Sequence, residues 1–143
     1  MSAEENKAII RRIPEEVINT GNLDRVDEVI AADYVDHFPL PPGFPSGLEG
    51  FKLFWRMVLS AFPDLRYTVD DVIADGDKVV VRVTSRATHQ GEFQGIPPTG
   101  RQVTWTEIHI GRLANGKLVE HWASVDQLGL LQQLGAIPAP ATA

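Results

Sequence analysis

The amino-acid sequence predicts an α+β fold, with helices in the first half of the chain and strands in the second. Apolar residues recur at helical spacing through roughly the first sixty residues, and β-branched residues with tight-turn dipeptides dominate roughly the next sixty. The 143 residues suffice for one continuous core, and no repeat or long linker divides them. We therefore predict a single domain over residues 1–137 and a loose tail over residues 138–143.

The N-terminal region reads as two short helical segments. Ser2 and Glu5 form a capping-box pattern at the start of the first segment. Pro14 lacks a backbone N–H and is expected to kink or split this helix. After the break at Gly21-Asn22, the apolar residues between positions 23 and 30 indicate a second short helix. The first segment presents one apolar face: Ile9, Ile10, Ile13, Val17 and Ile18.

A third helix follows the irregular, proline-rich segment 39–47. Ser46 and Glu49 repeat the capping-box pattern, and Pro63 ends the helix. Its apolar face is largely aromatic and comprises Phe51, Phe54, Trp55, Val58, Leu59 and Phe62. An aromatic stripe at helical spacing is typical of core packing, although Phe51 is also a candidate for substrate contact.

Two hairpins are predicted in the second half of the chain. Asp75-Gly76-Asp77 and Asn115-Gly116 are the turn signals, and a loop rich in glycine and proline, 90–101, connects the hairpins. Leucines between positions 128 and 134 indicate a short last helix. The predicted strands cover about 65–74, 78–89, 102–113 and 117–125.

A two-residue turn at Asn115-Gly116 fixes which residues face one another in the second hairpin. It places His109 opposite Trp122, Glu107 opposite Ser124 and Trp105 opposite Asp126. His121 then falls on the opposite face and is interpreted as structural. The first face mixes indoles, carboxylates and an imidazole, which is costly to bury without a purpose. We therefore predict that this face lines a cavity roofed by the helix over residues 51–62.

Composition restricts the class of partner. Asp and Glu total 19 and Lys and Arg total 13, for a net charge of −6, and no basic stretch favours nucleic acid or an anionic membrane. The chain contains no cysteine and no apolar run of the ~18 residues that span a bilayer. The polar N-terminus is unlike a signal peptide. We expect a cytoplasmic protein that binds an apolar small molecule.

Several stretches, in this order along the chain, resemble one known family, the SnoaL-like polyketide cyclases. The similarity covers 34–37, 61–65, 88–101, 116–122 and 133–135, together with Asp126. This family belongs to the superfamily of nuclear transport factor 2 and ketosteroid isomerase. The resemblance implies a cone-shaped barrel, in which N-terminal helices close the concave face of a strongly curved antiparallel sheet. It also implies a homodimer or homotetramer, and an intramolecular aldol ring closure that uses no metal and no cofactor.

The resemblance also implies a role for Asp126 as the acid/base group. Burial against Trp105 and Trp122 would raise the pKa of this carboxyl group. The alternative is that Asp126 caps the last helix, because it directly precedes the apolar run from Leu128.

The histidines and tryptophans are further candidates. His109 could donate to a substrate carbonyl or hold the aspartate, and His89 could lie at the pocket mouth or anchor the loop. His37 could reach the same cavity. Glu107 lies on the hairpin face that is predicted to line this cavity. Three indoles could stack on a flat ligand: Trp55, Trp105 and Trp122. The sequence contains no close pair of histidines of the kind that would predict a metal site.

Three kinds of function are compatible with these residues. The leading hypothesis is a cofactor-independent cyclase acting on an apolar carbonyl compound. A second hypothesis keeps the pocket but changes the acid/base reaction to isomerisation, dehydration or epoxide opening. In the third, the protein is a non-catalytic carrier of a small ligand or an association module.

Overall fold

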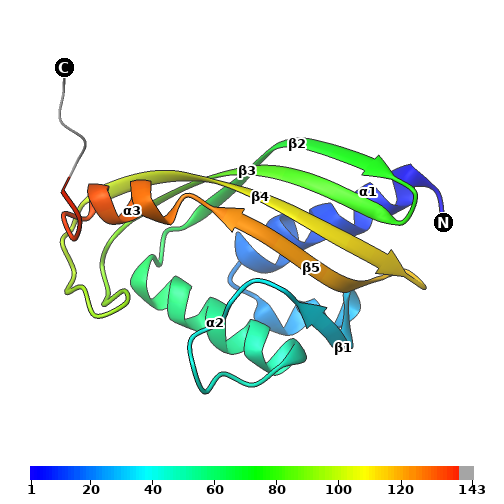
Figure 1. Ribbon diagram of the computed structural model, residues 1–143, viewed down its shortest axis with the longest axis horizontal. Coiled ribbons are helices and arrows are strands. Elements are labelled where there is room, and N and C mark those ends of the chain that lie inside the picture. The colour runs from blue at the N-terminus through cyan, green and yellow to red at the C-terminus, as the bar shows by residue number, and fades with distance from the viewer. Residues whose placement is uncertain (139–143) are drawn as a thin grey trace.

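A computed structural model describes residues 1–138 as a curved five-stranded sheet that arches over helices α1 and α2 (Figure 1). This confirms the α+β class and the position of the N-terminal helices. The sheet has the order β1-β5-β4-β3-β2 and stays open rather than closing into a barrel. Its strands are β1 (Ile30–Asp36), β2 (Arg66–Asp75), β3 (Lys78–Thr88), β4 (Gln102–Ala114) and β5 (Lys117–Val125).

The N-terminal region contains three helical segments of different kinds: α1 (Ala3–Arg12), the π-helix η1 (Ile13–Ile18) and the 3₁₀-helix η2 (Leu23–Glu28). The predicted capping box is confirmed, since Glu5 N donates to Ser2 Oγ and Ser2 N donates to Glu5 Oε1. The predicted break at Pro14 takes the form of a wider turn, in which Asn19 N donates to the carbonyl of Pro14 at 2.9 Å.

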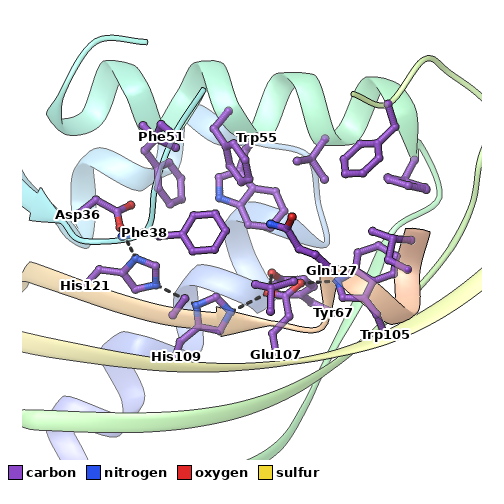
Figure 2. A pocket seen from close by; sticks show the side chains of 18 of the residues that line it. Asp36, Phe38, Phe51, Trp55, Tyr67, Trp105, Glu107, His109, His121 and Gln127 are labelled. Carbon is purple, nitrogen blue, oxygen red and sulfur yellow. Dashed lines mark hydrogen bonds and ion pairs between the residues drawn. The ribbon is translucent and has the colours of Figure 1, made fainter. Parts of the chain in front are cut away.

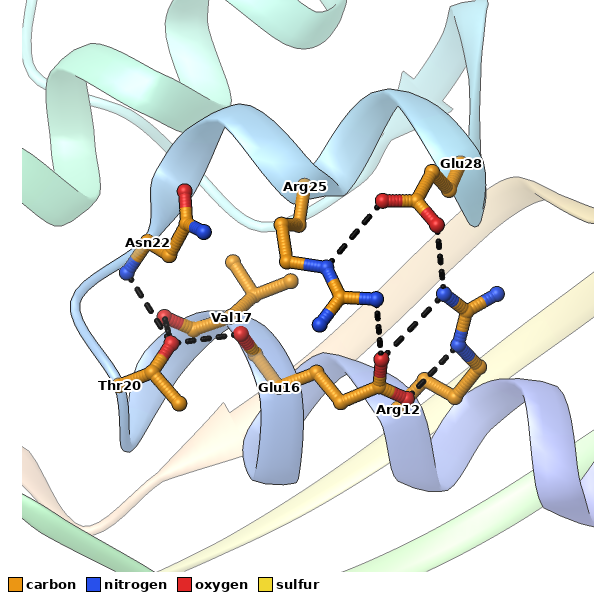
Figure 3. A network of polar contacts seen from close by, with 7 residues as sticks. All are labelled: Arg12, Glu16, Val17, Thr20, Asn22, Arg25 and Glu28. Atoms are coloured by element: carbon orange, nitrogen blue, oxygen red, sulfur yellow. Dashed lines mark hydrogen bonds and ion pairs between the residues drawn. The ribbon is translucent and has the colours of Figure 1, made fainter.

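Ion pairs join α1, η1 and η2 on their solvent-facing side (Figure 3). Arg12 bonds both Glu16 and Glu28 at 2.8 Å. Arg25 bonds the same two carboxylates, at 2.8 Å and 3.2 Å. Each pair is partly exposed and weak alone, but the closed arrangement fixes one orientation of the two segments.

Strand β1 is the element that the sequence did not predict. The second helix was expected to include Ile30, but η2 ends at Glu28 and the chain continues as a strand to Asp36. β1 pairs with β5 in parallel, which corrects the expectation of an entirely antiparallel sheet. This pairing joins segments distant in sequence, so local residue preferences did not reveal it.

Helices α2 (Gly47–Ala61) and α3 (Gln127–Gln133) lie where the apolar patterns predicted them. The capping box at Ser46 is wrong in one respect, because Ser46 is the N-cap residue but its side chain makes no capping hydrogen bond. No helix within residues 1–138 is long and apolar enough to cross a membrane. Most of the predicted loose tail, residues 139–143, lies outside the described residues.

The register of the β4–β5 hairpin differs from the prediction by one residue. Ala114 pairs with Lys117 and Leu113 with Leu118, as a two-residue turn requires. Arg112 then pairs with Glu120, so Val119 is an extra residue in β5. Beyond this bulge, His109 lies opposite Ala123 and Glu107 opposite Val125. A one-residue slip turns every following side chain to the other face of the sheet.

Candidate active site

A hollow of about 800 Å³, including its open mouth, lies between α2 and the concave face of the sheet. We call it the main hollow. Aromatic side chains dominate its lining, in agreement with the predicted cavity roofed by the third helix. They come from α2, from the loops after β1 and β3, and from β2 and β4: Phe38, Phe51, Phe54, Trp55, Phe62, Tyr67, Phe93 and Trp105. Such a lining favours a flat apolar ligand.

Four charged or titratable side chains form a continuous chain of hydrogen bonds along one wall of the main hollow (Figure 2). Asp36 Oδ1 contacts His121 Nδ1 at 2.9 Å. His121 Nε2 contacts His109 Nδ1 at 2.9 Å, and His109 Nε2 contacts Glu107 Oε1 at 2.7 Å. We call this set the carboxylate–imidazole chain, and its two histidines the imidazole pair.

Glu107 is the buried end of this chain. Its Oε1 accepts hydrogen bonds from Tyr67 Oη and His109, and its Oε2 accepts from Trp105 Nε1 at 2.6 Å and Ser85 Oγ at 3.3 Å. Burial raises the pKa of this carboxyl group, but the bond to His109 and the other donors outweigh burial, so the pKa of Glu107 is lowered. Four donors thus keep Glu107 ionised inside the protein.

Asp36 is the opposite end and is also ionised. It accepts from the backbone N–H of Phe38 at 2.9 Å and from the hydroxyl of Tyr34 at 3.0 Å, besides His121. Burial acts to raise the pKa of Asp36, whereas the contacts with His121 and Phe38 lower it, and the net shift is downward. The burial of the Tyr34 phenol beside this carboxylate raises the phenol's pKa, so Tyr34 remains a donor.

The contacts of the imidazole pair determine which ring nitrogens face a carboxylate and which face each other. With both carboxylates ionised, each carboxylate contact uses one imidazole N–H. The contact between His109 and His121 needs a further proton, because two bare ring nitrogens would repel each other. One of the two facing nitrogens can therefore donate while the other accepts, so the imidazole pair offers a donor and an acceptor side by side.

Comparison with known proteins bears on what this wall does. A family model described as SnoaL-like polyketide cyclase matches residues 8–134, which is most of the chain. The chain belongs to the SnoaL-like polyketide cyclase family. It is 31% identical to nogalonic acid methyl ester cyclase of Streptomyces nogalater over 118 residues, covering 82% of this chain and 88% of the relative.

Solved structures similar to this chain share its fold closely. IdmH from Streptomyces antibioticus, a proposed polyketide cyclase, is 38% identical with a TM-score of 0.80, covering 91% of this chain and 98% of IdmH. AclR from Streptomyces galilaeus, a proposed hydroxylase, is 34% identical with a TM-score of 0.84, covering 98% of this chain and 87% of AclR. Proteins similar to this chain have therefore been assigned different reactions.

The SnoaL-like motif at residues 116–122 contains the bulge, which changes two predicted positions. Trp122 was expected in the cavity and His121 outside it. His121 lines the main hollow, whereas Trp122 lies on the opposite face and stacks on His37, with ring centroids 4.9 Å apart. Neither His37 nor Trp122 is among the described residues that line the main hollow.

Asp126 lies at the N-terminus of α3, where its side chain is exposed and accepts from Gly129 N at 3.0 Å. It is not among the described lining residues, so the geometry supports the helix-capping alternative. His89 is fully buried and lies outside the lining as well. Its Nδ1 accepts from Thr99 N at 3.2 Å, which supports the loop-anchoring alternative.

The remaining candidates lie on the wall of the main hollow: Phe51, Trp55, Trp105, Glu107 and His109. Three members of the site were not predicted from the sequence. Asp36, Tyr67 and His121 complete the carboxylate–imidazole chain or hold its end. A signal for two of them was present, since Asp36 and His121 belong to stretches that carried the family resemblance.

Proposed function

We propose that the protein closes a carbon–carbon ring in an apolar poly-β-keto substrate by acid/base catalysis at the imidazole pair, without a metal or a cofactor. The observation that carries this proposal is the carboxylate–imidazole chain inside an aromatic hollow. Family membership supports the reaction class, because relatives are named as cyclases of nogalonic and aklanonic acid methyl esters. We also propose that the protein acts in the cytoplasm and that it is a homodimer or homotetramer.

The imidazole pair supplies the groups that touch the substrate. About 20% of each imidazole side chain is accessible, whereas Glu107 is buried behind them. The two ring nitrogens that face each other are not bonded to a carboxylate. A substrate β-dicarbonyl inserted between them replaces only the imidazole–imidazole contact. Glu107 and Asp36 act as positioning residues, because each fixes the far nitrogen of one ring.

Ring closure then needs no outside reactant. The neutral imidazole takes the proton from the carbon between two carbonyl groups, and the protonated imidazole donates a hydrogen bond to the developing enolate oxygen. The enolate carbon attacks a second carbonyl of the same molecule. A carbon–carbon bond forms, and the carbonyl π bond becomes an alkoxide that takes up the abstracted proton. Substrate and product are isomers.

Two amide substitutions test the imidazole pair while sparing the carboxylates. His109→Gln keeps an N–H near Glu107, and His121→Asn keeps an N–H near Asp36, but neither amide accepts a proton at neutral pH. We expect each variant to lower turnover of aklanonic or nogalonic acid methyl ester by about 10²–10⁴-fold. Liquid chromatography with mass spectrometry measures the isomeric product, and thermal unfolding checks that the variants are folded.

Asp126 provides the matched control. Asp126→Asn keeps a capping side chain and is expected to retain parental turnover, whereas Asp126→Ala lowers the free energy of unfolding by about 1 kcal/mol with turnover unchanged. Loss of turnover in Asp126→Asn together with normal turnover in both histidine variants would overturn the proposal. A product one oxygen heavier would contradict ring closure and match the reaction proposed for AclR.

A further inference from the structure

A second hollow, of about 630 Å³ including the space at its open mouth, lies between the N-terminal helical segments and the sheet. Its lining differs from that of the main hollow. Beyond the side chains that the two hollows share, it is mainly aliphatic, with residues from α1, η1, β3 and β5: Ile10, Ile13, Ile18, Val81, Val83 and Leu118. Flat aromatic walls suit a planar ring system, whereas aliphatic walls suit a chain of methylene groups.

The sequence creates this hollow through the break at Pro14. Pro14 lines the second hollow together with Ile13 and Ile18, which are the two ends of η1. A π-helical turn is wider than an α-helical turn, and π-turns of this kind occur frequently at functional sites. Arg12 and Arg25 both pair with Glu16, which belongs to this turn, on its solvent-facing side.

Apart from the imidazole pair, the polar side chains at the second hollow are already hydrogen-bonded. The hydroxyl of Tyr34 donates to Asp36, and the hydroxyl of Tyr67 donates to Glu107. A polar ligand group placed there would lose its hydration without gaining a free partner, which is unfavourable. The second hollow therefore selects for an apolar occupant.

The two hollows share a wall that contains the imidazole pair. His109 and His121 line both hollows, as do Phe51, Trp55 and Tyr67. A ligand that fills both hollows crosses this wall between the two rings of the imidazole pair. Opening the contact between these rings leaves Glu107 and Asp36 each paired with its own histidine. The part of the ligand beside the imidazole pair is then the part that joins its two halves.

We propose that the second hollow binds an unbranched alkyl tail of the substrate, while the ring or poly-β-keto body occupies the main hollow and the β-dicarbonyl lies at the imidazole pair. This inference rests on the proposed function, because it takes the imidazole pair as the reacting groups. It narrows the substrate class to carbonyl compounds that carry a linear alkyl chain next to the reactive carbon.

A series of naphthyl β-diketones, whose second acyl group lengthens from acetyl to decanoyl, tests the tail site by titration calorimetry. We expect the association constant to rise about fourfold for each added methylene group, and then to level off once the second hollow is full. Ile13→Trp narrows this hollow and should end the rise at a shorter tail. Ile13→Leu conserves volume and should follow the parent protein. Ala123→Leu, in the main hollow, should weaken the binding of all compounds in the series equally.

Thermal unfolding establishes that each variant is folded, and Val81→Leu narrows the hollow from the sheet side should Ile13→Trp fail to fold. An association constant independent of tail length, or a rise that ends at the same length in every variant, would overturn the tail site. Loss of turnover in His109→Gln alongside that result would leave the proposed function standing. A tail-length dependence together with normal turnover in His109→Gln would overturn the proposed function and keep the tail site.

Discussion

A histidine–glutamate pair lies on each face of the β4–β5 hairpin, in different surroundings. On the concave face, His109 bonds Glu107 at 2.7 Å, with 20% and 6% of their side chains accessible. On the convex face, His37 bonds Glu120 at the same distance, with 43% and 24% accessible. Distance and chemistry are equal, so the faces differ in burial and in the further partners of each pair.

Burial decides which pair is a site. Glu107 owes its lowered pKa to donors that overcome a large desolvation cost, and removing a donor exposes that cost. Glu120 owes its lowered pKa mainly to Arg112, at 2.9 Å, and then to His37, and water compensates for the loss of either. The concave pair can therefore hold a proton in a fixed place, whereas the convex pair is a solvated contact.

Glu107→Gln should break the concave pair and have the largest effect on stability and turnover among the changes compared in the following paragraphs. The amide group offers an N–H toward Trp105 Nε1 or toward His109, where an acceptor is required, so one buried donor loses its partner. We expect the free energy of unfolding to fall by about 1–3 kcal/mol. Turnover should fall about a hundredfold or more because His109 loses its fixed orientation, with the loss in kcat rather than in KM. Urea unfolding and steady-state kinetics measure the two effects.

A merely structural role for Glu107 makes a different prediction for the same variant. Stability would fall, but kcat of the folded fraction would equal that of the parent protein. Glu107→Asp separates the two roles further, since it restores the charge while shortening the reach to His109. Partial recovery of kcat in Glu107→Asp is the outcome that a positioning role requires.

The pH dependence of stability should differ between Glu107→Gln and the parent protein, and this effect is expected to be of intermediate size. The pKa values of Glu107 and Asp36 are lowered in the folded protein, so both carboxylates stabilise it at pH values above their ordinary pKa. This stabilisation is lost as the pH falls below about 4.3 and through the lowered values. Thermal unfolding between pH 7 and pH 3 should show a flatter decline for Glu107→Gln than for the parent protein. A parallel decline would mean that the pKa of Glu107 is the same in the folded and the unfolded protein.

Local patterns predicted most of the fold. The capping box at Ser2, the aromatic face of α2 and the turn at Asn115-Gly116 each depend on neighbouring residues, and each is confirmed. Strand β1 was not predicted, because its partner β5 lies far along the chain and its own segment, including Ala31 and Ala32, has weak strand preference.

Only part of the candidate site was predictable, mainly because the extra residue Val119 changes the register of β5. Alternation in β4 correctly put Trp105, Glu107 and His109 on one face. The bulge at Val119 reversed every later assignment in β5, so His121 and Trp122 exchanged faces. The tight turn specifies the first pairs of the hairpin, but the extra residue is accommodated by tertiary packing. Asp36 was missed for a different reason, since its position depends on the unpredicted strand β1.

Glu120→Gln is the matched substitution on the convex face, and its predicted effect is the smallest. Glu120 pairs with Arg112 and His37 at the surface, where water replaces a lost ion pair at little cost. We expect kcat and KM equal to those of the parent protein and an unfolding midpoint within the scatter of repeated measurements. A loss of turnover comparable with that of Glu107→Gln would show that the convex face takes part in the reaction. Burial would then not be what distinguishes the two pairs, and the assignment of the site to the concave face would fail.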